Sequence, residues 1–497
     1  MDRNQRANLV DHISQHAEFF HDPENHCYAV LRRNGHEETW PIESKDFELW
    51  VSQLSYSLLN ETPGSSDLES IKNQFTGIAR FDGYEKSVYL RVGHDADSIY
   101  LDLCNDSWDI VQVRAGHVEI ARNCPVRFRR TSAMRHLPLP IEGGDLSELF
   151  AHVNIANKDD RLLLVAALLE SFRPNTPFPI LVFEGQQGCG KSKTQDRLRD
   201  LVDPSKANLR AAPRRVEDIF VGATNNWFYS LNNLSHLSAS QQDALCTLST
   251  GGGYAARTLY TDLNETVAEV MRPVMMNGIR TLPTAQDLID RCIVFELPII
   301  SESQRKSERK LDQEFQKARP RILGAILSAL AKTMRYLPEV ELPRAPRMAD
   351  FAELGVAAER ALGWGDGNFL DAYERNRIRS MAHGIESSPV ALAVCKMIAD
   401  TPEGYSGPIG YLSLRLDKYR PPDTTAWPKS ARGLADTLRR QAPALLQAEE
   451  IKIEFDEKRH QDGYHIKIYS VALSRRKNER HEHDEHRTAE KYRREVI

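Results

Sequence analysis

Residues 185–192 read GQQGCGKS and have the residue types and spacing that bind a phosphate chain. They fit the pattern G-x-x-x-x-G-K-[S/T], in which glycines let backbone N–H groups turn toward the phosphates. Lys191 is expected to neutralise the β- and γ-phosphates, and Ser192 is expected to ligate Mg²⁺. The residues expected to hold the nucleotide are Gly185, Gly188, Cys189, Gly190, Lys191, Ser192 and Lys193.

The segments on either side of this loop support the same interpretation. FPILVFEG at 178–185 is a continuous apolar run that ends in glycine, which is typical of a buried parallel strand. KTQDRLRDLV at 193–202 favours a helix, whose amino end adds partial positive charge to the loop. The loop does not identify the base, and the expected ligand is ATP with Mg²⁺.

Residues 232–298 resemble the ATPase core of superfamily 3 helicases, an AAA+ type also found in the helicase half of phage and mobile-element primase-helicases. DALCTLSTGGGYAARTLYTD at 243–262 is similar to the family's TGG segment and basic β-hairpin, which contacts DNA in a ring channel. The resemblance assigns that contact to Tyr254, Arg257 and Tyr260. An arginine flanked by aromatics can pair with phosphate and stack on bases. The alternative is a structural hairpin with an ordinary surface arginine.

Two further segments carry the resemblance. RPVMMNGI at 272–279 is similar to the sensor-1 strand, which makes Asn277 the residue that orients the attacking water. QDLIDRCIVFELP at 286–298 places Arg291 where the family has an arginine finger, which acts on a neighbour's nucleotide and implies a homo-hexamer or another ring. The alternatives are an ordinary turn asparagine, and a surface pair of Arg291 with Asp287 or Asp290.

The strand that should end in acidic residues departs from the family. WFYSLNNLSHLS at 227–238 offers Asn232 and Asn233 instead. The amide of Asn232 can hydrogen-bond a magnesium-bound water, but it cannot act as a general base, a role worth roughly 10² to 10⁴ in rate. Asp218 or Asp243 could supply the missing charge, although spacing alone places neither there. Hydrolysis is therefore expected to be slow or absent.

The predicted fold is α/β: a P-loop AAA+ core with a parallel sheet and flanking helices, a small mixed α+β amino-terminal domain and a carboxyl-terminal winged helix. Helical periodicity followed by two alternating strands at 452–470 indicates the winged helix. Its basic helix places Arg432 and Arg439 against DNA, with a solvated basic face as the alternative. The domains are 1–140 (amino-terminal), 141–340 (core), 341–384 (helical connector), 385–473 (winged helix) and 474–497 (charged tail).

Composition limits the possible partners and compartment. The 497 residues are 41% hydrophobic and 27% charged, and no apolar run approaches the roughly 20 residues of a membrane span. The seven cysteines never form a CxxC pair, and the amino-terminal residues do not resemble a signal peptide, so the expected location is the cytoplasm. With a net charge of −5, any DNA contact must be local.

The combined hypothesis is a ring ATPase of a prophage or mobile element that acts on single-stranded DNA and works with a primase or another replication protein. The second hypothesis is an ATP-binding, DNA-associated scaffold with weakened hydrolysis. The third is a signalling ATPase whose winged helix recognises protein. ATP turnover distinguishes the first two, and DNA affinity at low salt distinguishes the third.

Overall fold

A parallel β-sheet lies at the centre of the chain. The computed structural model describes residues 1–121, 124–257, 265–279, 282–421, 427–461 and 463–472. The sheet strands are β10 (Ile180–Glu184), β11 (Tyr229–Leu234), β14 (Val274–Gly278) and β15 (Cys292–Glu296). Their order is β11–β14–β10–β15, and each neighbouring pair is parallel. The fold is therefore mixed α/β, and β10 and β14 are wholly buried because both faces of the sheet are covered.

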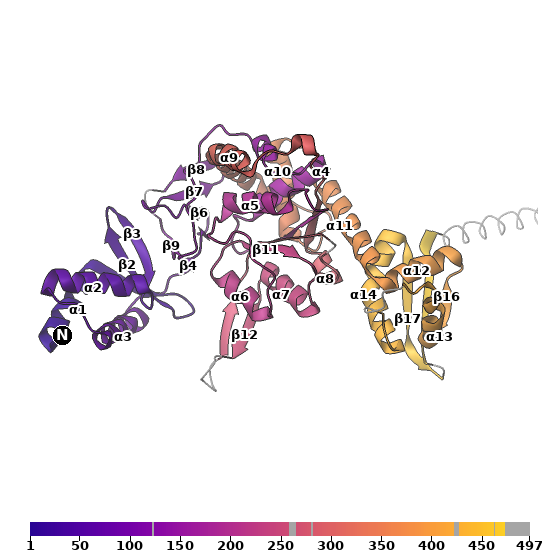
Figure 1. The fold of residues 1–497 in the computed structure, drawn as a ribbon, viewed down its shortest axis with the longest axis horizontal. Helices are drawn as coiled ribbons and strands as arrows, with labels where there is room; N and C mark the ends of the chain where they lie inside the picture. The colour runs from indigo at the N-terminus through magenta and orange to yellow at the C-terminus, as the bar shows by residue number, and fades with distance from the viewer. Residues whose placement is uncertain (122–123, 258–264, 280–281, 422–426, 462, 473–497) are drawn as a thin grey trace, which may run out of the picture.

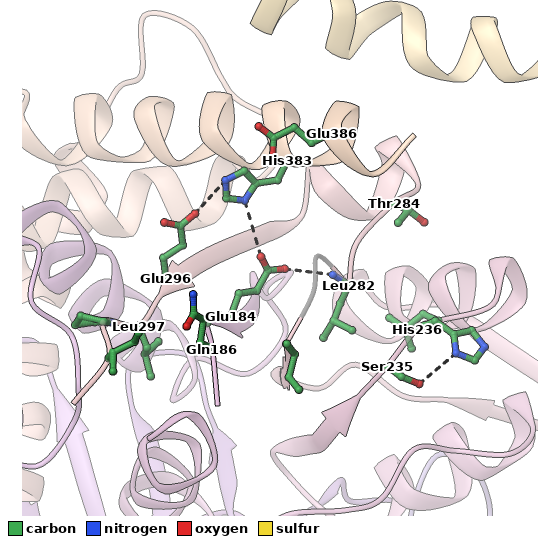
Figure 2. A pocket seen from close by; sticks show the side chains of 15 residues that line it. Glu184, Gln186, Ser235, His236, Leu282, Thr284, Glu296, Leu297, His383 and Glu386 are labelled. Atoms are coloured by element: carbon green, nitrogen blue, oxygen red, sulfur yellow. Dashed lines mark hydrogen bonds and ion pairs between the residues drawn. The ribbon is translucent and has the colours of Figure 1, made fainter. Parts of the chain in front are cut away.

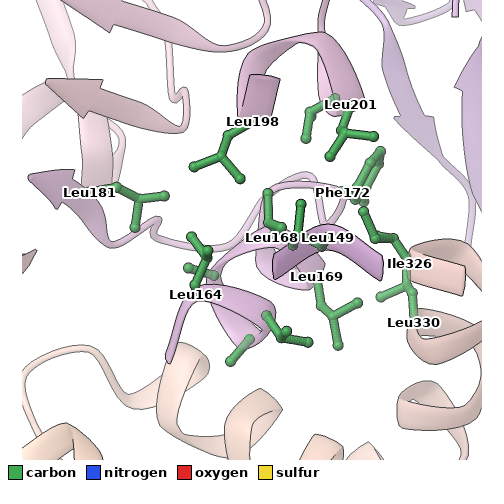
Figure 3. Close-up of a cluster of buried hydrophobic side chains, with 14 of the residues drawn as sticks. Leu149, Leu164, Leu168, Leu169, Phe172, Leu181, Leu198, Leu201, Ile326 and Leu330 are labelled. Carbon is green, nitrogen blue, oxygen red and sulfur yellow. The ribbon is translucent and has the colours of Figure 1, made fainter. Parts of the chain in front are cut away.

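Helices cover the two faces of the sheet. Alternate residues of β10 point to opposite faces, so Leu181 packs with Leu198 on one side and Val182 packs with Ile219 on the other. Figure 3 shows part of the first of these clusters, where Leu181 of the sheet faces leucine side chains of the covering helices. The helices of that cluster are α4 (Lys158–Glu170), α5 (Lys191–Val202), α9 (Glu308–Tyr336), α10 (Ala349–Leu362) and α11 (Asn368–Ser387). Those of the other are α6 (Val216–Thr224), α7 (Ala239–Thr250) and α8 (Gln286–Ile289).

The first part of the chain has a hydrophobic core of its own. Three antiparallel strands pack against three helices, with Leu9, Phe47 and Phe75 fully buried between them. This part lies at one end of the molecule (Figure 1). Its elements are α1 (Arg3–His16), β1 (Ala17–His21), β2 (Cys27–Arg33), β3 (His36–Pro41), α2 (Lys45–Leu59) and α3 (Ser65–Phe81).

Three of the strands that follow contribute buried residues to the core of the central part. Val92, Leu101 and Val111 are fully buried in the same cluster as Leu149 and Ile326. The predicted boundary near residue 140 therefore separates segments that share one core, because linker composition does not reveal long-range packing. The strands of this region are β4 (Val88–Tyr89), β5 (Val92–His94), β6 (Ile99–Asp102), β7 (Ile110–Arg114), β8 (His117–Ile120) and β9 (Arg127–Phe128), and the three that share the central core are β5, β6 and β7. Among the described residues, short 3₁₀ helices occur at Leu146–Ala151, Glu302–Gln304, Leu337–Glu339 and Asp417–Tyr419.

The last part of the described chain is joined to the centre by one helix, α11 (Asn368–Ser387). Its three-stranded antiparallel sheet has the order β16–β18–β17. The predicted hairpin is present, whereas the sequence did not indicate the short elements β16 and α13. The elements are α12 (Pro389–Asp400), β16 (Tyr405–Pro408), α13 (Ile409–Leu416), α14 (Ala431–Glu449), β17 (Ile451–His460) and β18 (Gly463–Ser470). No helix in the described ranges is long and apolar enough to cross a membrane.

A buried ion network ties the central sheet to the strands before it. Asp203, just after α5, accepts from Arg91 Nε at 3.0 Å and from the Phe228 backbone N–H at 3.0 Å, and it lies 3.5 Å from Arg199 Nη2. Both arginine residues are fully buried, and burial lowers the pKa of Arg199. Asp203 is the carboxylate that forms ion pairs with both buried guanidinium groups.

Asp203→Ala is expected to lower the free energy of unfolding by about 3–5 kcal/mol, because it leaves two buried guanidinium groups without their counter-ion. Denaturant unfolding followed by fluorescence measures the loss. Glu314→Ala, which removes an exposed pair with Lys306, is the control and should change stability by less than about 0.5 kcal/mol. Equal losses in the two variants would contradict the assignment.

Candidate nucleotide site

The loop 185–192 connects the carboxyl end of β10 to the amino end of α5. Gly190 begins the helix with a φ of 78°, a left-handed conformation that favours glycine. Gly185 has a φ of 142°, and a Cβ there would lie 2.8 Å from the Leu297 carbonyl oxygen. These two positions explain the glycines of the motif. The loop thus places free N–H groups and the positive end of the α5 dipole at one edge of the sheet.

Lys191 folds back over the loop. Its Nζ donates to the carbonyl oxygens of Gly185 at 2.6 Å and Gln186 at 2.9 Å, and it lies 3.6 Å from Cys189 Sγ. These partners hold the ammonium group over the loop where a phosphate chain would lie. Lys193, also predicted to bind nucleotide, instead forms a 2.9 Å ion pair with Asp312 of α9.

A network of side chains connects the loop to the ends of β11 and β14. Ser192 Oγ donates to Asn232 Oδ1 at 2.8 Å, and Asn277 Nδ2 donates to the same oxygen at 2.7 Å. Asn277 Nδ2 also donates to Gln195 Oε1, while Asn277 Oδ1 accepts from the Asn233 backbone N–H at 2.9 Å. The structure thus brings together Ser192, Asn232 and Asn277, three residues that lie far apart in the sequence.

The two acids considered as substitutes for the missing carboxylate lie elsewhere. Asp218 accepts from the backbone N–H groups of Arg214 and Arg215 at the start of α6, and Asp243 is exposed on α7. Within the described ranges, neither carboxylate has a hydrogen bond to the network of Ser192, Asn232 and Asn277. The network is built from amides and a hydroxyl, which can order water around a cation but cannot accept a proton near neutral pH.

Arg291 lies at the amino ends of the sheet strands, whereas the loop of the same chain lies at their carboxyl ends. Its carbonyl oxygen accepts from the backbone N–H of Ile180, at the amino end of β10. Its guanidinium Nη1 lies 2.5 Å from Asp287 Oδ1 and donates to the Asp287 carbonyl oxygen at 2.7 Å. The pairing with Asp287 considered from sequence is therefore present. In a contact between two copies of the chain, Arg291 of one copy would meet the nucleotide bound to the loop of the other. The structure describes one copy of the chain, so the role of Arg291 as an arginine finger stays a prediction.

The residues predicted to contact nucleic acid lie on two distant elements. Strands β12 (Gly253–Arg257) and β13 (Glu265–Glu269) form an antiparallel hairpin that projects from the central part (Figure 1). Tyr254 and Arg257 lie on β12, whose backbone alone is described, and Tyr260 lies outside the described residues. Arg432 and Arg439 are exposed on α14; Arg439 lies 3.3 Å from Asp436 and 4.8 Å from the ring of Phe455.

The structure adds two residues to the site that sequence reasoning missed. Asn154 Nδ2 donates to the carbonyl oxygens of Cys189 at 2.8 Å and Pro298 at 2.7 Å, which fastens the loop to the segment after β15. Gln195 Nε2 donates to Ser230 Oγ at 2.7 Å and to the Leu231 carbonyl oxygen at 2.9 Å. The position of Gln195, one turn after Lys191 on the same helix, is the only signal that could have indicated it.

Sequence reasoning also overlooked residues 157–160, Asn-Lys-Asp-Asp, which fit the N-K-x-D element that reads guanine in GTPases. In the structure this segment begins a helix. Asn157 caps α4 by accepting from the Asp159 backbone N–H, and Asp160 pairs with Arg379 at 2.9 Å. Both side chains therefore have structural partners, and the match gives no reason to replace ATP with GTP.

Two protein-family models match separate parts of the chain. Residues 146–377 match the model of the actinomycete integrative conjugative element replication protein, and residues 390–482 match the C-terminal domain model of the same replication protein. The chain thus belongs to a family of replication proteins of mobile elements. The predicted mobile-element origin is confirmed in this general form. No curated protein sequence matches the chain.

Among solved structures, the chain is similar to two apo forms of the NrS-1 C-terminal region. One has 11% identity and a TM-score of 0.41, with 93% of this chain and 98% of that chain covered. The other has 10% identity and a TM-score of 0.40, with 95% and 100% covered. A JCV helicase with a bound small molecule is similar at 12% identity and a TM-score of 0.24, over 47% of this chain and 64% of that chain.

Proposed function

We propose that this protein is an ATP-binding, DNA-associated ring ATPase of the helicase or translocase type that serves replication of a mobile element. The observation that carries the proposal is the meeting of Lys191, Ser192, Asn232 and Asn277 at the carboxyl edge of the parallel sheet. Lys191 would bind the β- and γ-phosphates, and Ser192 would hold Mg²⁺. Asn277 would order the water that attacks the γ-phosphate.

Supporting features lie outside this site. The family is a replication family, and the β12–β13 hairpin follows a run of glycines as in the superfamily 3 helicases that the sequence resembles. The last part of the chain combines α12, α13 and α14 with a strand hairpin, which we interpret as a winged helix that presents Arg432 and Arg439 to DNA. Several copies around a channel would concentrate these charges despite the net charge of −5.

A second candidate function is an ATP-binding scaffold that assembles on DNA without rapid turnover. The amide of Asn232 supports it, since that amide occupies the position where a carboxylate would activate water. Steady-state ATP hydrolysis by the purified protein, with and without single-stranded DNA, separates the two functions. DNA-stimulated turnover supports the motor, whereas tight ATP binding with no turnover supports the scaffold.

Asn232→Asp is expected to raise the rate of ATP hydrolysis by roughly 10²-fold, because it places a proton acceptor beside Ser192 without a change in side-chain size. The measurement is phosphate release at saturating ATP. Asn225→Asp, which changes an exposed residue after α6, is the matched control and should leave the rate unchanged. A rate that stays at the wild-type level in Asn232→Asp would show that another group already supplies the base.

A further inference from the structure

A cavity of about 840 Å³ opens beside the loop, on the side of the sheet where α11 passes. Figure 2 shows His383 of α11 between two glutamates at the ends of neighbouring strands. Its Nε2 lies 3.0 Å from Glu296 Oε1 at the end of β15, and its Nδ1 lies 3.9 Å from Glu184 Oε2 at the end of β10. The other oxygen of Glu184 accepts from the Leu282 backbone N–H at 3.2 Å. One imidazole therefore joins the strand before the loop to α11.

The charge around His383 favours this contact. Glu184 is only 6% exposed, and burial raises the pKa of its carboxyl, so its ionised form depends on a nearby cation. Glu296 and Glu386 line the same cavity and add negative charge around the imidazole. Through its contacts with Glu296 and Glu184, the His383 side chain connects α11 to the ends of β15 and β10.

The helix that carries His383 belongs to both parts of the protein. Near its middle, Asn376 exchanges hydrogen bonds with the backbone of Val294 in β15, at 3.1 Å and 2.8 Å. Near its end, Met381 and Ile385 are buried in the hydrophobic cluster of the last part of the chain. His383 thus lies where α11 passes from the ATPase sheet to the elements α12 to β18. A change in its contacts would act on the orientation of those elements.

The segment that follows Glu184 contacts Lys191, which is expected to bind the nucleotide. Lys191 donates to the carbonyl oxygens of Gly185 and Gln186, the two residues that directly follow Glu184. A bound triphosphate would draw the ammonium group to its own oxygens, and it would add negative charge next to Glu184. The segment joined to His383 would therefore have different partners with and without nucleotide, which is the requirement for coupling between two sites.

We propose that His383 is a positioning residue that couples nucleotide binding at the loop to the DNA affinity of the last part of the chain. The inference rests on the proposed function, since it takes ATP and DNA as the two ligands. It does not require turnover. A scaffold that assembles on ATP would use the same coupling.

The test measures the affinity for fluorescein-labelled oligodeoxythymidine by anisotropy, with and without magnesium AMP-PNP. In the wild type, nucleotide is expected to change this affinity by at least about 5-fold. In His383→Ala, the ratio of the DNA affinities with and without AMP-PNP should be close to 1. The affinities of this variant for AMP-PNP and for DNA alone should stay within about 3-fold of wild type. His383→Gln replaces the ring N–H with an amide N–H that can donate to Glu296. This variant should show an intermediate effect of AMP-PNP on the DNA affinity.

His236→Ala is the matched control. His236 lines the same cavity, but its described partner is the adjacent residue Ser235 and not a residue of α11, so the variant should behave as wild type. Wild-type coupling in His383→Ala, or equal loss in His236→Ala, overturns the inference. A wild-type protein that binds both ligands without coupling also overturns it and leaves the proposed function standing. If the wild type does not bind AMP-PNP, both the inference and the proposed function are overturned.

Discussion

Arg291→Ala is expected to lower ATP turnover by roughly 10³-fold, the low end of the effect of an arginine that reaches a neighbour's γ-phosphate. ATP affinity should stay nearly constant, because Arg291 lies at the far edge of the sheet from the loop of its own chain. The measurements are steady-state turnover and binding of a fluorescent ATP analogue. A loss of affinity without loss of turnover would contradict the role.

A mixture of two inactive variants tests whether the site is shared. Lys191→Ala lacks the phosphate ligand but keeps Arg291, and Arg291→Ala has the opposite defect. If one copy supplies each residue, an equal mixture should form complete sites at about a quarter of its interfaces and regain activity in that proportion. No recovery on mixing would show that the two residues act within one chain, or that Arg291 only binds Asp287.

Lys191→Ala is expected to weaken ATP binding by roughly 10² to 10⁴. The ammonium group would make at least two charge-assisted hydrogen bonds to phosphate oxygens, each worth about 1.5–3 kcal/mol. Titration calorimetry with magnesium AMP-PNP measures the change. Lys317→Ala, on the exposed face of α9, is the control and should bind as wild type does. Equal affinity in Lys191→Ala would remove the basis for an ATP site.

Local sequence patterns predicted the strand, loop and helix around Lys191 well. A run of four buried apolar residues and a glycine-rich turn are determined by neighbours in the sequence, so their signal is local. The family resemblance placed Asn277 and Asn232 at the ends of two strands, but it did not predict the hydrogen bond between their side chains. The roles of the site residues stay predictions until nucleotide is bound and its contacts are measured.

Other features depend on long-range packing that the sequence does not express. His383 and Glu184 are nearly two hundred positions apart, and neither belongs to a motif. Asn154 reaches the loop from a turn with no recognisable pattern. The short elements β16 and α13 were missed because four to eight residues give too little periodicity.

The way the hydrophobic cores are divided decides where this chain can be cut. Residues 1–81 fill a core of their own, whereas β5, β6 and β7 contribute buried side chains to the cluster that surrounds Leu149 and Ile326. A fragment that starts at residue 141 would therefore expose one wall of its interior to water and tend to aggregate. A fragment that starts just before β4 would keep that wall intact. The amino-terminal part is thus the exchangeable module, and the strands after it are not.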